Sequence, residues 1–172
     1  MNNIKLKFDN DGFIVNENLI NQVDLEAIEK WISELNDSKE VNHHYEKTVN
    51  GKVLSRTENF VSSHTSFREF LLSSSIKDYL TMLFDDEPIL FKEKINYKYP
   101  GGAGYAPHQD APAYPFGKKH ITMLLAIDDS DINNGCLEFA RGRNNEGIIN
   151  IDEKGCIDCL LYTSDAADDH HR

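Results

Sequence analysis

The sequence is poor in the residues that several classes of protein require. Its 172 residues include three cysteines, too few for a disulfide scaffold, and this scarcity predicts a reducing, cytoplasmic location. No apolar run is long enough to cross a bilayer, and residues 1–7 lack the apolar core of a signal peptide. Basic residues are outnumbered, 18 Lys and Arg against 29 Asp and Glu, which gives a formal charge of −11. This excess of acidic side chains predicts neither a nucleic-acid partner nor a membrane partner.

The composition that remains is that of an ordinary globular protein. With 40% apolar and 27% charged residues, the chain can form one domain with a real core, but not comfortably two. The run Cys156-Ile157-Asp158-Cys159 has the spacing of a redox or zinc motif. A structural zinc site needs a second such pair, and the sequence has none, so we assign this motif no function. No feature of the sequence indicates an oligomeric state.

The first part of the chain, about residues 1–88, is predicted to be mainly helical. Apolar residues recur on one face between positions 25 and 35, and Asn21 is placed to cap the start of this helix. A second helical pattern spans 66–84, with serines at 73–75 that are able to divide it. Two segments are expected to differ: a turn at Gly12 leading into a short strand at 13–15, and a loop over the polar residues 36–52.

From about residue 89 to residue 158 the pattern changes to short strands. Residues 89–99 alternate in polarity, and further mostly apolar segments lie at 120–128, 136–140 and 147–151. Helices followed by many short strands predict an α+β chain that is mainly β. Its strands are expected to form a sandwich or barrel with the helices packed on one side.

The pattern most suggestive of chemistry is His108-Gln109-Asp110. In an extended segment, side chains two residues apart point to the same face, so this imidazole and this carboxylate can reach one metal ion. Such a pair supplies two of the three ligands in the 2-His-1-carboxylate triad of non-haem Fe(II) oxygenases. Pro107 and Pro112 restrict the backbone on both sides, which suits a ligand pair held in one geometry.

The spacing alone does not distinguish a metal site from a polar loop. His44-Tyr45-Glu46 has the same spacing within a polar segment, where we interpret it as solvent-exposed surface. From the residues by themselves, His108 and Asp110 are equally consistent with metal binding and with a structural role.

The residues around this pair resemble a known family. Residues 91–98 (FKEKINYK), 101–112 (GGAGYAPHQDAP) and 134–138 (NGCLE) are similar to the phytanoyl-CoA dioxygenase superfamily of Fe(II)/2-oxoglutarate oxygenases. Together with Asp11-Gly12-Phe13 before an amphipathic helix, the resemblance covers most of residues 8–145. The chain departs from the family at 140–144 (ARGRN), where the family commonly has Pro-Gly-Ser-His.

This resemblance implies a fold, a reaction and a set of ligands. The implied fold is a double-stranded β-helix, the jelly roll of cupin-like proteins, with Fe(II) at one open end. The implied enzyme is a dioxygenase that uses O2 and 2-oxoglutarate, releases succinate and CO2, and hydroxylates a small organic molecule. His108 and Asp110 match the first two iron ligands of the family.

Further positions are implied to line the pocket for 2-oxoglutarate and substrate. Arg56 is an additional candidate for binding an anionic group, and is equally consistent with a surface ion pair to Glu58. Lys92, Lys94, Asn96 and Thr122 are assigned to the co-substrate, and Tyr114 is assigned to the substrate side. The alternative for Lys92, Lys94 and Asn96 is a solvated strand face, and a packing role is as consistent for Thr122 and Tyr114.

The remaining iron ligand is not found where the resemblance places it. A distal His and a carboxylate-binding Arg should follow several dozen residues after Asp110, but His120 is too near. The tail 159–172 (CLLYTSDAADDHHR) resembles the translation of a sequencing adapter. We therefore expect the natural domain to end near residue 158, its β-helix to be incomplete, and the chain to be inactive by itself.

Two hypotheses follow for the function. In the first, residues 1–158 are part of an Fe(II)/2-oxoglutarate-dependent hydroxylase. In the second, the chain is a non-catalytic, cupin-like or β-sandwich module that binds a small molecule, and His108 and Asp110 are structural.

Overall fold

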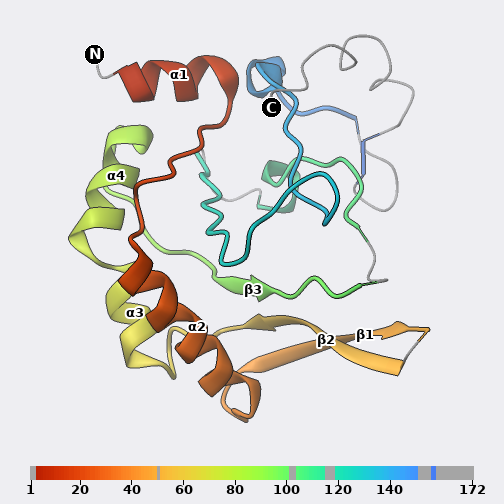
Figure 1. Cartoon of the computed structure of the whole chain (residues 1–172). Helices are drawn as coiled ribbons and strands as arrows, with labels where there is room; N and C mark the ends of the chain where they lie inside the picture. Colours follow the sequence, from red (N-terminus) through yellow and green to blue (C-terminus); the bar gives the residue numbers. More distant parts are fainter. Residues whose placement is uncertain (1–2, 50, 101–103, 115–118, 151–155, 158–172) are drawn as a thin grey trace. The chain divides into compact units, whose positions relative to one another are not determined.

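Regular structure is unevenly distributed along the chain. In a computed structural model, residues 3–49, 51–100, 104–114, 119–150 and 156–157 are described. The chain divides into unit 1 (Met1–Val15 and Gly104–Arg172) and unit 2 (Asn16–Ala103). Among the described residues, unit 2 contains three helices and the three-stranded sheet, whereas unit 1 contains one α-helix and two short 3-10 helices among irregular segments (Figure 1).

The first predicted helix of unit 2 is confirmed as α2 (Gln22–Asn36). The side chain of Asn21 accepts a hydrogen bond from the backbone N–H of Asp24 at 3.0 Å, so it satisfies a donor that the first helical turn leaves unpaired. Ile28 and Leu35, seven residues apart on one face, are almost completely buried. The cap and the apolar stripe together explain why the helix forms here.

The predicted division of the second helical segment is also confirmed. It forms α3 (Thr65–Leu71) and α4 (Ser74–Phe84), with Ser73 as the residue before α4. At the start of α3, Nδ1 of His64 accepts a hydrogen bond from the backbone N–H of Phe67 at 3.2 Å. The chain leaves α4 at Asp85, whose backbone is left-handed with φ 59°. These ends place Phe67 and Ile76 in the core of unit 2.

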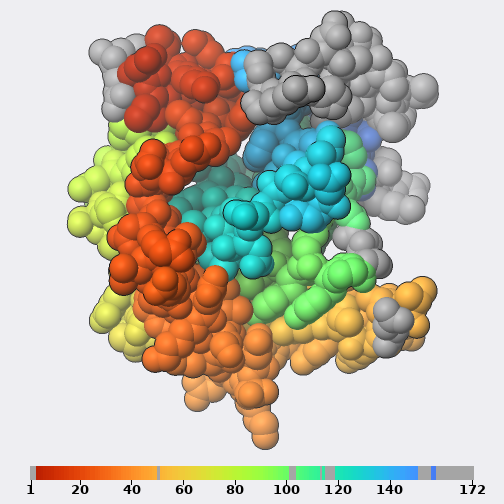
Figure 2. Space-filling model, viewed as in Figure 1, coloured from red at the N-terminus to blue at the C-terminus, as the bar shows by residue number. Residues whose placement is uncertain are grey.

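The prediction of a loop over residues 36–52 is wrong. Most of this segment belongs to an antiparallel hairpin of β1 (Asn42–Thr48) and β2 (Gly51–Glu58). Gly51 turns the chain with φ 117°, a value that glycine adopts without a steric penalty. Polar side chains occupy both faces of β1, so its strand period could not be read from hydrophobicity. Figure 2 shows the hairpin, in light orange, reaching away from the helices of its own unit.

The strand predicted over residues 89–99 is confirmed only in its centre. β3 (Lys94–Asn96) pairs antiparallel with β2 and completes a sheet of order β1-β2-β3. The register places Arg56 opposite Asn96 and Glu58 opposite Lys94. β2 is therefore the central strand, and Arg56 and Glu58 occupy alternate positions along it.

A buried hydroxyl connects β1, β2 and the residue that follows β3 to α2. Thr57 has no exposed surface, and its Oγ1 lies 2.9 Å from Nδ1 of His43 and 3.2 Å from the hydroxyl of Tyr97. Tyr97 in turn donates to the side-chain oxygen of Asn36 at 3.2 Å. Burial raises the pKa of Tyr97, which keeps its hydroxyl protonated and able to donate. The apolar core around this network consists of Ile28, Leu35, Val41, Phe60, Phe67, Ile76 and Leu83.

Unit 1 begins with a helix where a turn and a short strand were predicted. α1 (Asn3–Asp11) ends at Gly12, whose backbone N–H donates to the carbonyl of Phe8 at 2.9 Å and whose φ is 82°. The glycine therefore terminates a helix, and residues 13–15 form no strand.

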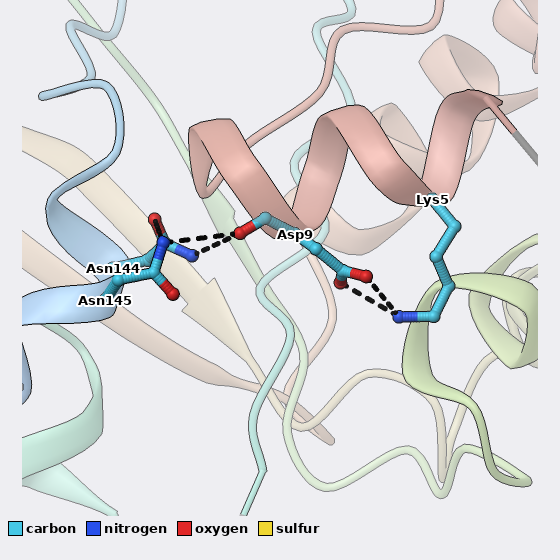
Figure 3. Close-up of polar contacts among 4 residues, drawn as sticks. All are labelled: Lys5, Asp9, Asn144 and Asn145. Carbon is cyan, nitrogen blue, oxygen red and sulfur yellow. Dashed lines mark hydrogen bonds and ion pairs between the residues drawn. The ribbon is translucent and has the colours of Figure 1, made fainter.

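The end of α1 is joined to η2 (Arg143–Glu146) by polar contacts. The carbonyl of Asp9 accepts from the side-chain amides of Asn144 and Asn145 at 3.1 and 3.5 Å, while Lys5 pairs with the Asp9 carboxylate at 2.9 Å (Figure 3). A Cβ atom at Gly12 would come within 2.7 Å of the Asn144 side chain. Glycine is therefore required here both by its positive φ and by this close approach.

The strands predicted at 120–128, 136–140 and 147–151 are not formed in the part of unit 1 that the structure describes, and residue 151 lies outside that part. Between Ile121 and Ile127 burial still alternates with period two, as a strand pattern predicts. A strand also needs a neighbour for its backbone N–H and C=O groups, and among the described residues these segments have no ladder partner. The structure thus shows a mixed α+β chain and does not show the jelly roll. In its described residues no helix is both long and apolar enough to cross a membrane.

The Thr57 network generates a prediction for stability. Thr57→Val keeps the volume of the side chain but leaves His43 and Tyr97 without their common partner, so we expect a loss of about 1–3 kcal/mol in the free energy of unfolding. Urea unfolding followed by circular dichroism measures it. The matched control is Thr81→Val, at an exposed position on α4, with an expected change within about 0.5 kcal/mol. Equal effects of the two substitutions would show that the buried hydroxyl is not needed.

Candidate metal centre

His108 is oriented by a hydrogen bond to its own chain. Its Nδ1 lies 2.8 Å from the carbonyl oxygen of Ala106. Because a carbonyl oxygen only accepts, Nδ1 carries the proton, and the neutral ring has its lone pair on Nε2. Metal-binding histidines are commonly fixed by such a bond from the second ring nitrogen. The contact therefore selects the tautomer whose Nε2 is able to bind a metal.

Asp110 is oriented by a side chain from a later segment of unit 1. Its Oδ2 accepts a hydrogen bond from the hydroxyl of Thr122 at 2.6 Å. The other oxygen, Oδ1, lies 3.6 Å from Nε2 of His108. Thr122, assigned to co-substrate binding from the sequence, is thus bonded to the candidate metal ligand. One carboxylate oxygen is occupied by this bond and the other faces the imidazole.

Nε2 of His108 and Oδ1 of Asp110 are close enough to share one metal ion. Two metal–ligand bonds of about 2.1 Å each span at most about 4.2 Å, which exceeds the observed separation. The two side chains are 45% and 41% exposed, so an ion in solution can reach both. One imidazole and one carboxylate fit two positions of the Fe(II) triad. Among the described residues, however, no three His, Cys, Asp or Glu side chains are grouped to hold a metal.

The backbone of the pair is bent at its second member. Asp110 has φ −73° and ψ −34°, which are helical values, and precedes the 3-10 helix η1 (Ala111–Ala113). The expectation of an extended segment is therefore wrong at Asp110, because Pro112 favours a tight turn immediately after it. The two side chains nevertheless meet, although the alternation of an extended strand does not account for their contact.

Gln109 was missed as a residue that positions the pair. Its side-chain amide donates to the carbonyl of Gly147 at 2.9 Å, and its Oε1 accepts from the backbone N–H of Ile149 at 2.9 Å. Pro107 is held similarly, since its carbonyl accepts from the N–H of Ile157 at 2.8 Å. The His108–Asp110 segment is therefore fixed to distant backbone from its opposite side. The available signal was the position of Gln109 between two candidate ligands, where alternation directs it away from them.

Tyr114, the predicted substrate-side residue, lies directly after η1. Its ring centroid is 5.8 Å from that of His120, at a tilt of 40°. Both residues belong to unit 1, as do His108, Asp110 and Thr122. The four other predicted site residues, Arg56, Lys92, Lys94 and Asn96, belong to unit 2.

In unit 2 the structure gathers three basic side chains around one carboxylate. Glu58 is 8% exposed. Its Oε1 lies 3.0 Å from Nε of Arg56 and 3.1 Å from Nζ of Lys92, and its Oε2 lies 3.4 Å from Nε2 of His44. We call these four residues the Glu58 cluster. Arg56 and Lys92 together carry two positive charges against the one negative charge of Glu58, so the cluster has an excess of positive charge.

The cations determine the ionisation of Glu58. Burial disfavours its charged form, but the hydrogen bond from Lys92 and the charges of Arg56, Lys92 and His44 outweigh this effect, so the pKa of Glu58 lies below its ordinary value of 4.5. The ion pair to Glu58 that was one of the two sequence interpretations of Arg56 is present. Lys94 and Asn96 lie exposed on β3, on the face opposite the half-buried Ile95.

Comparison with known proteins identifies the family. The sequence profile of the family described as "Phytanoyl-CoA dioxygenase (PhyH)" matches residues 8–154. The chain belongs to this family, as the motifs around His108 predicted.

Curated relatives of the chain have been named for their reactions. One, named methylphosphonate hydroxylase, from Gimesia maris, is 38% identical over 156 residues, which are 88% of this chain and 60% of the relative. Another, named 2-aminoethylphosphonate dioxygenase, from an uncultured bacterium, is 36% identical over 161 residues, or 89% and 62% of the two chains. A third, named Dioxygenase lolE1, from Epichloe uncinata, is 33% identical over 131 residues, which are 73% of this chain and 51% of the relative.

The chain thus spans about 60% of the length of the first two of these relatives. No solved structure matches the chain.

A prediction follows for Gln109. Gln109→Leu removes both bonds to residues 147–149, so the His108–Asp110 segment should lose its fixed geometry, and Fe(II) affinity should fall by about 10–100-fold. Anaerobic calorimetric titration of Fe(II) measures it. Gln22→Leu, at an exposed position on α2, serves as control. If both variants bind Fe(II) as the parent chain does, Gln109 does not position the pair.

A second prediction concerns acid. Because the folded-state pKa of Glu58 is lowered, its contribution to stability is present above the unfolded-state value near 4.5 and is lost as the pH falls through the folded-state value. Glu58→Gln should therefore cost about 1–3 kcal/mol of unfolding free energy at pH 7 and progressively less below about pH 4.5. Urea unfolding at a series of pH values tests this, with Glu69→Gln, exposed on α3, as control. A difference that does not change with pH would contradict the assignment.

Proposed function

We propose that this chain carries the iron-binding segment of an Fe(II)/2-oxoglutarate-dependent dioxygenase that hydroxylates a small organophosphonate, with release of succinate and CO2. Membership of the phytanoyl-CoA dioxygenase family supports the reaction class. The observation that carries the proposal is the geometry of His108 and Asp110, whose Nε2 and Oδ1 atoms lie 3.6 Å apart.

In this proposal Nε2 of His108 and Oδ1 of Asp110 hold Fe(II), and bound iron supplies the activation of O2 at the expense of 2-oxoglutarate. The residues around the pair hold it ready. Ala106 keeps the proton of His108 on Nδ1, so the ring does not have to change tautomer to bind iron. Thr122 keeps one oxygen of Asp110 engaged, which favours binding of the metal through the other oxygen alone.

The triad needs a third protein ligand, which we expect from a segment outside the described residues. The segments at 120–128 and 136–140 are proposed to pair as strands in a complete jelly roll. Two observations agree with this: burial alternates along the first segment, and large apolar side chains are exposed in both, among them Leu124 at 58% and Phe139 at 56%.

The substrate class is inferred from the relatives and agrees with the charges of the chain. Two of the relatives are named for phosphonates. A phosphonate and 2-oxoglutarate are both multiply charged anions, and a protein with an overall charge of −11 needs a local excess of cations to bind them. The Glu58 cluster supplies such an excess through Arg56 and Lys92, and Lys94 and Asn96 remain candidates for contact with the co-substrate. Tyr114 remains the candidate on the substrate side.

The proposal is tested by anaerobic titration of the full chain with Fe(II) and 2-oxoglutarate, monitoring the metal-to-ligand charge-transfer band in the visible. We expect weak binding that His108→Ala and Asp110→Asn each reduce by at least about tenfold. His120→Ala, which removes a different exposed histidine of unit 1, should have no such effect. Binding that is indifferent to His108 and Asp110 would favour the non-catalytic binding module instead.

The same samples, exposed to O2, test the need for a third ligand. With methylphosphonate or 2-aminoethylphosphonate present, we expect no coupled formation of succinate and hydroxylated product by this chain. Succinate formation that requires both Fe(II) and 2-oxoglutarate would contradict the view that the described residues hold an incomplete centre.

A further inference from the structure

Unit 2 contains a hollow of about 370 Å³ to which no function has been assigned so far. It is lined by Asn59, Val61, Ser62, Arg68, Leu90 and Glu93. Its volume is at the lower end of the range of ligand sites, which is about 300–1,000 Å³. The hollow therefore has room for a small molecule.

The negative group of the hollow is fixed in place. Oε1 of Glu93 accepts a hydrogen bond from the backbone N–H of Val61 at 3.0 Å, and Glu93 is only partly exposed. Within the described part of the chain, the structure shows no partner for the other carboxylate oxygen. Glu93 thus presents one oriented, unoccupied acceptor to the hollow.

The positive group is Arg68, exposed on α3. In a chain with 29 acidic side chains, its guanidinium makes no ion pair with any described carboxylate, including that of Glu93 in the same hollow. The two opposite charges therefore do not neutralise each other. Val61 and Leu90 add apolar surface to the lining, and the amide of Asn59 and the hydroxyl of Ser62 add neutral polar groups.

We propose that this hollow binds a small zwitterion, with a primary ammonium on Glu93 and an anionic group on Arg68. A short alkyl spacer would contact Val61 and Leu90. A simple anion would lose affinity through the Glu93 carboxylate, and a simple cation would lose affinity through the Arg68 guanidinium, because like charges in one small site repel. Only a ligand with both charges satisfies both groups. The anionic group is a carboxylate or a phosphonate, since both accept two hydrogen bonds from a guanidinium.

The inference does not depend on iron, and its test contains none. The full chain, labelled with ¹⁵N, is titrated with β-alanine and with 2-aminoethylphosphonate, and backbone amide shifts are followed by NMR. We expect at least one of the two to shift the amides of residues 59–62 and 90–93 with saturation in the millimolar range. Saturation by β-alanine identifies a carboxylate site, and saturation by 2-aminoethylphosphonate alone identifies a phosphonate site. Propionate and ethylamine, which each carry one of the two charges, should bind at least about tenfold more weakly.

Two variants and two matched controls locate the site. Glu93→Gln retains an oxygen for the Val61 N–H, so it removes the charge with little change in the local fold. It and Arg68→Gln should each weaken zwitterion binding by about 10–100-fold. Glu69→Gln and Arg141→Gln, at exposed positions that do not line the hollow, should leave it unchanged.

Three results would overturn the inference. The first is the absence of saturable shifts with either zwitterion up to 10 mM, on the order of a weak ligand's affinity. The second is binding of propionate or ethylamine as tight as that of the zwitterions. The third is unchanged binding in both hollow variants, with circular dichroism spectra confirming that they are folded. Because no metal is present, none of these results bears on the iron-binding proposal.

Discussion

The register of β2 is the constraint on which most of unit 2 depends, and the buried hydroxyl of Thr57 fixes it. A shift of one residue along a strand exchanges its two faces. Thr57 is bonded to His43 and Tyr97 on the two neighbouring strand segments, so such a shift would leave buried polar groups without partners. With Thr57 directed inward, Arg56 and Glu58 share the other face and form their ion pair. The position of the charged cluster is therefore a consequence of one hydrogen-bond network.

Unit 1 is organised differently, because local polar contacts replace an apolar core. None of its described residues is among the buried apolar side chains of the chain. The candidate metal pair is held by a carbonyl, a hydroxyl and a side-chain amide, from Ala106, Thr122 and Gln109. These contacts act on opposite sides of the His108–Asp110 segment. Two metal-binding atoms can thus be placed accurately before any metal is bound, although little apolar burial surrounds them.

The parts of the fold that could be predicted from the sequence are those governed by local signals. The apolar period of α2, its cap Asn21 and the break at Ser73 are each visible within a few residues, and each was confirmed. The β1–β2 hairpin was not predicted, because polar residues on both faces of β1 conceal the strand period. Gly12 was assigned to a turn because a glycine that ends a helix and one that begins a hairpin have the same local signature.

The same distinction, between features set by local sequence and features set by distant contacts, applies to the candidate site. The pairing of His108 with Asp110 followed from their spacing and from the family motif, which are both local. Their orienting partners were not predicted, since Thr122 and Gly147 are brought to the site by the path of the chain. The contacts of Glu58 with Lys92 and His44 were not predicted either, because they depend on how three separate segments of the chain meet.

The contact between α1 and η2 has a consequence for how the chain folds. The carbonyl of Asp9 is bonded to Asn144, 135 positions later, so unit 1 is assembled from two segments that flank unit 2 in the sequence. A ribosome delivers all of residues 16–103 before the second segment exists. Unit 2, whose contacts are closer in sequence, can therefore fold first during synthesis, whereas α1 must wait for its partner residues. α1, the first helix to be synthesised, therefore remains without its partner residues until almost the whole chain has been made.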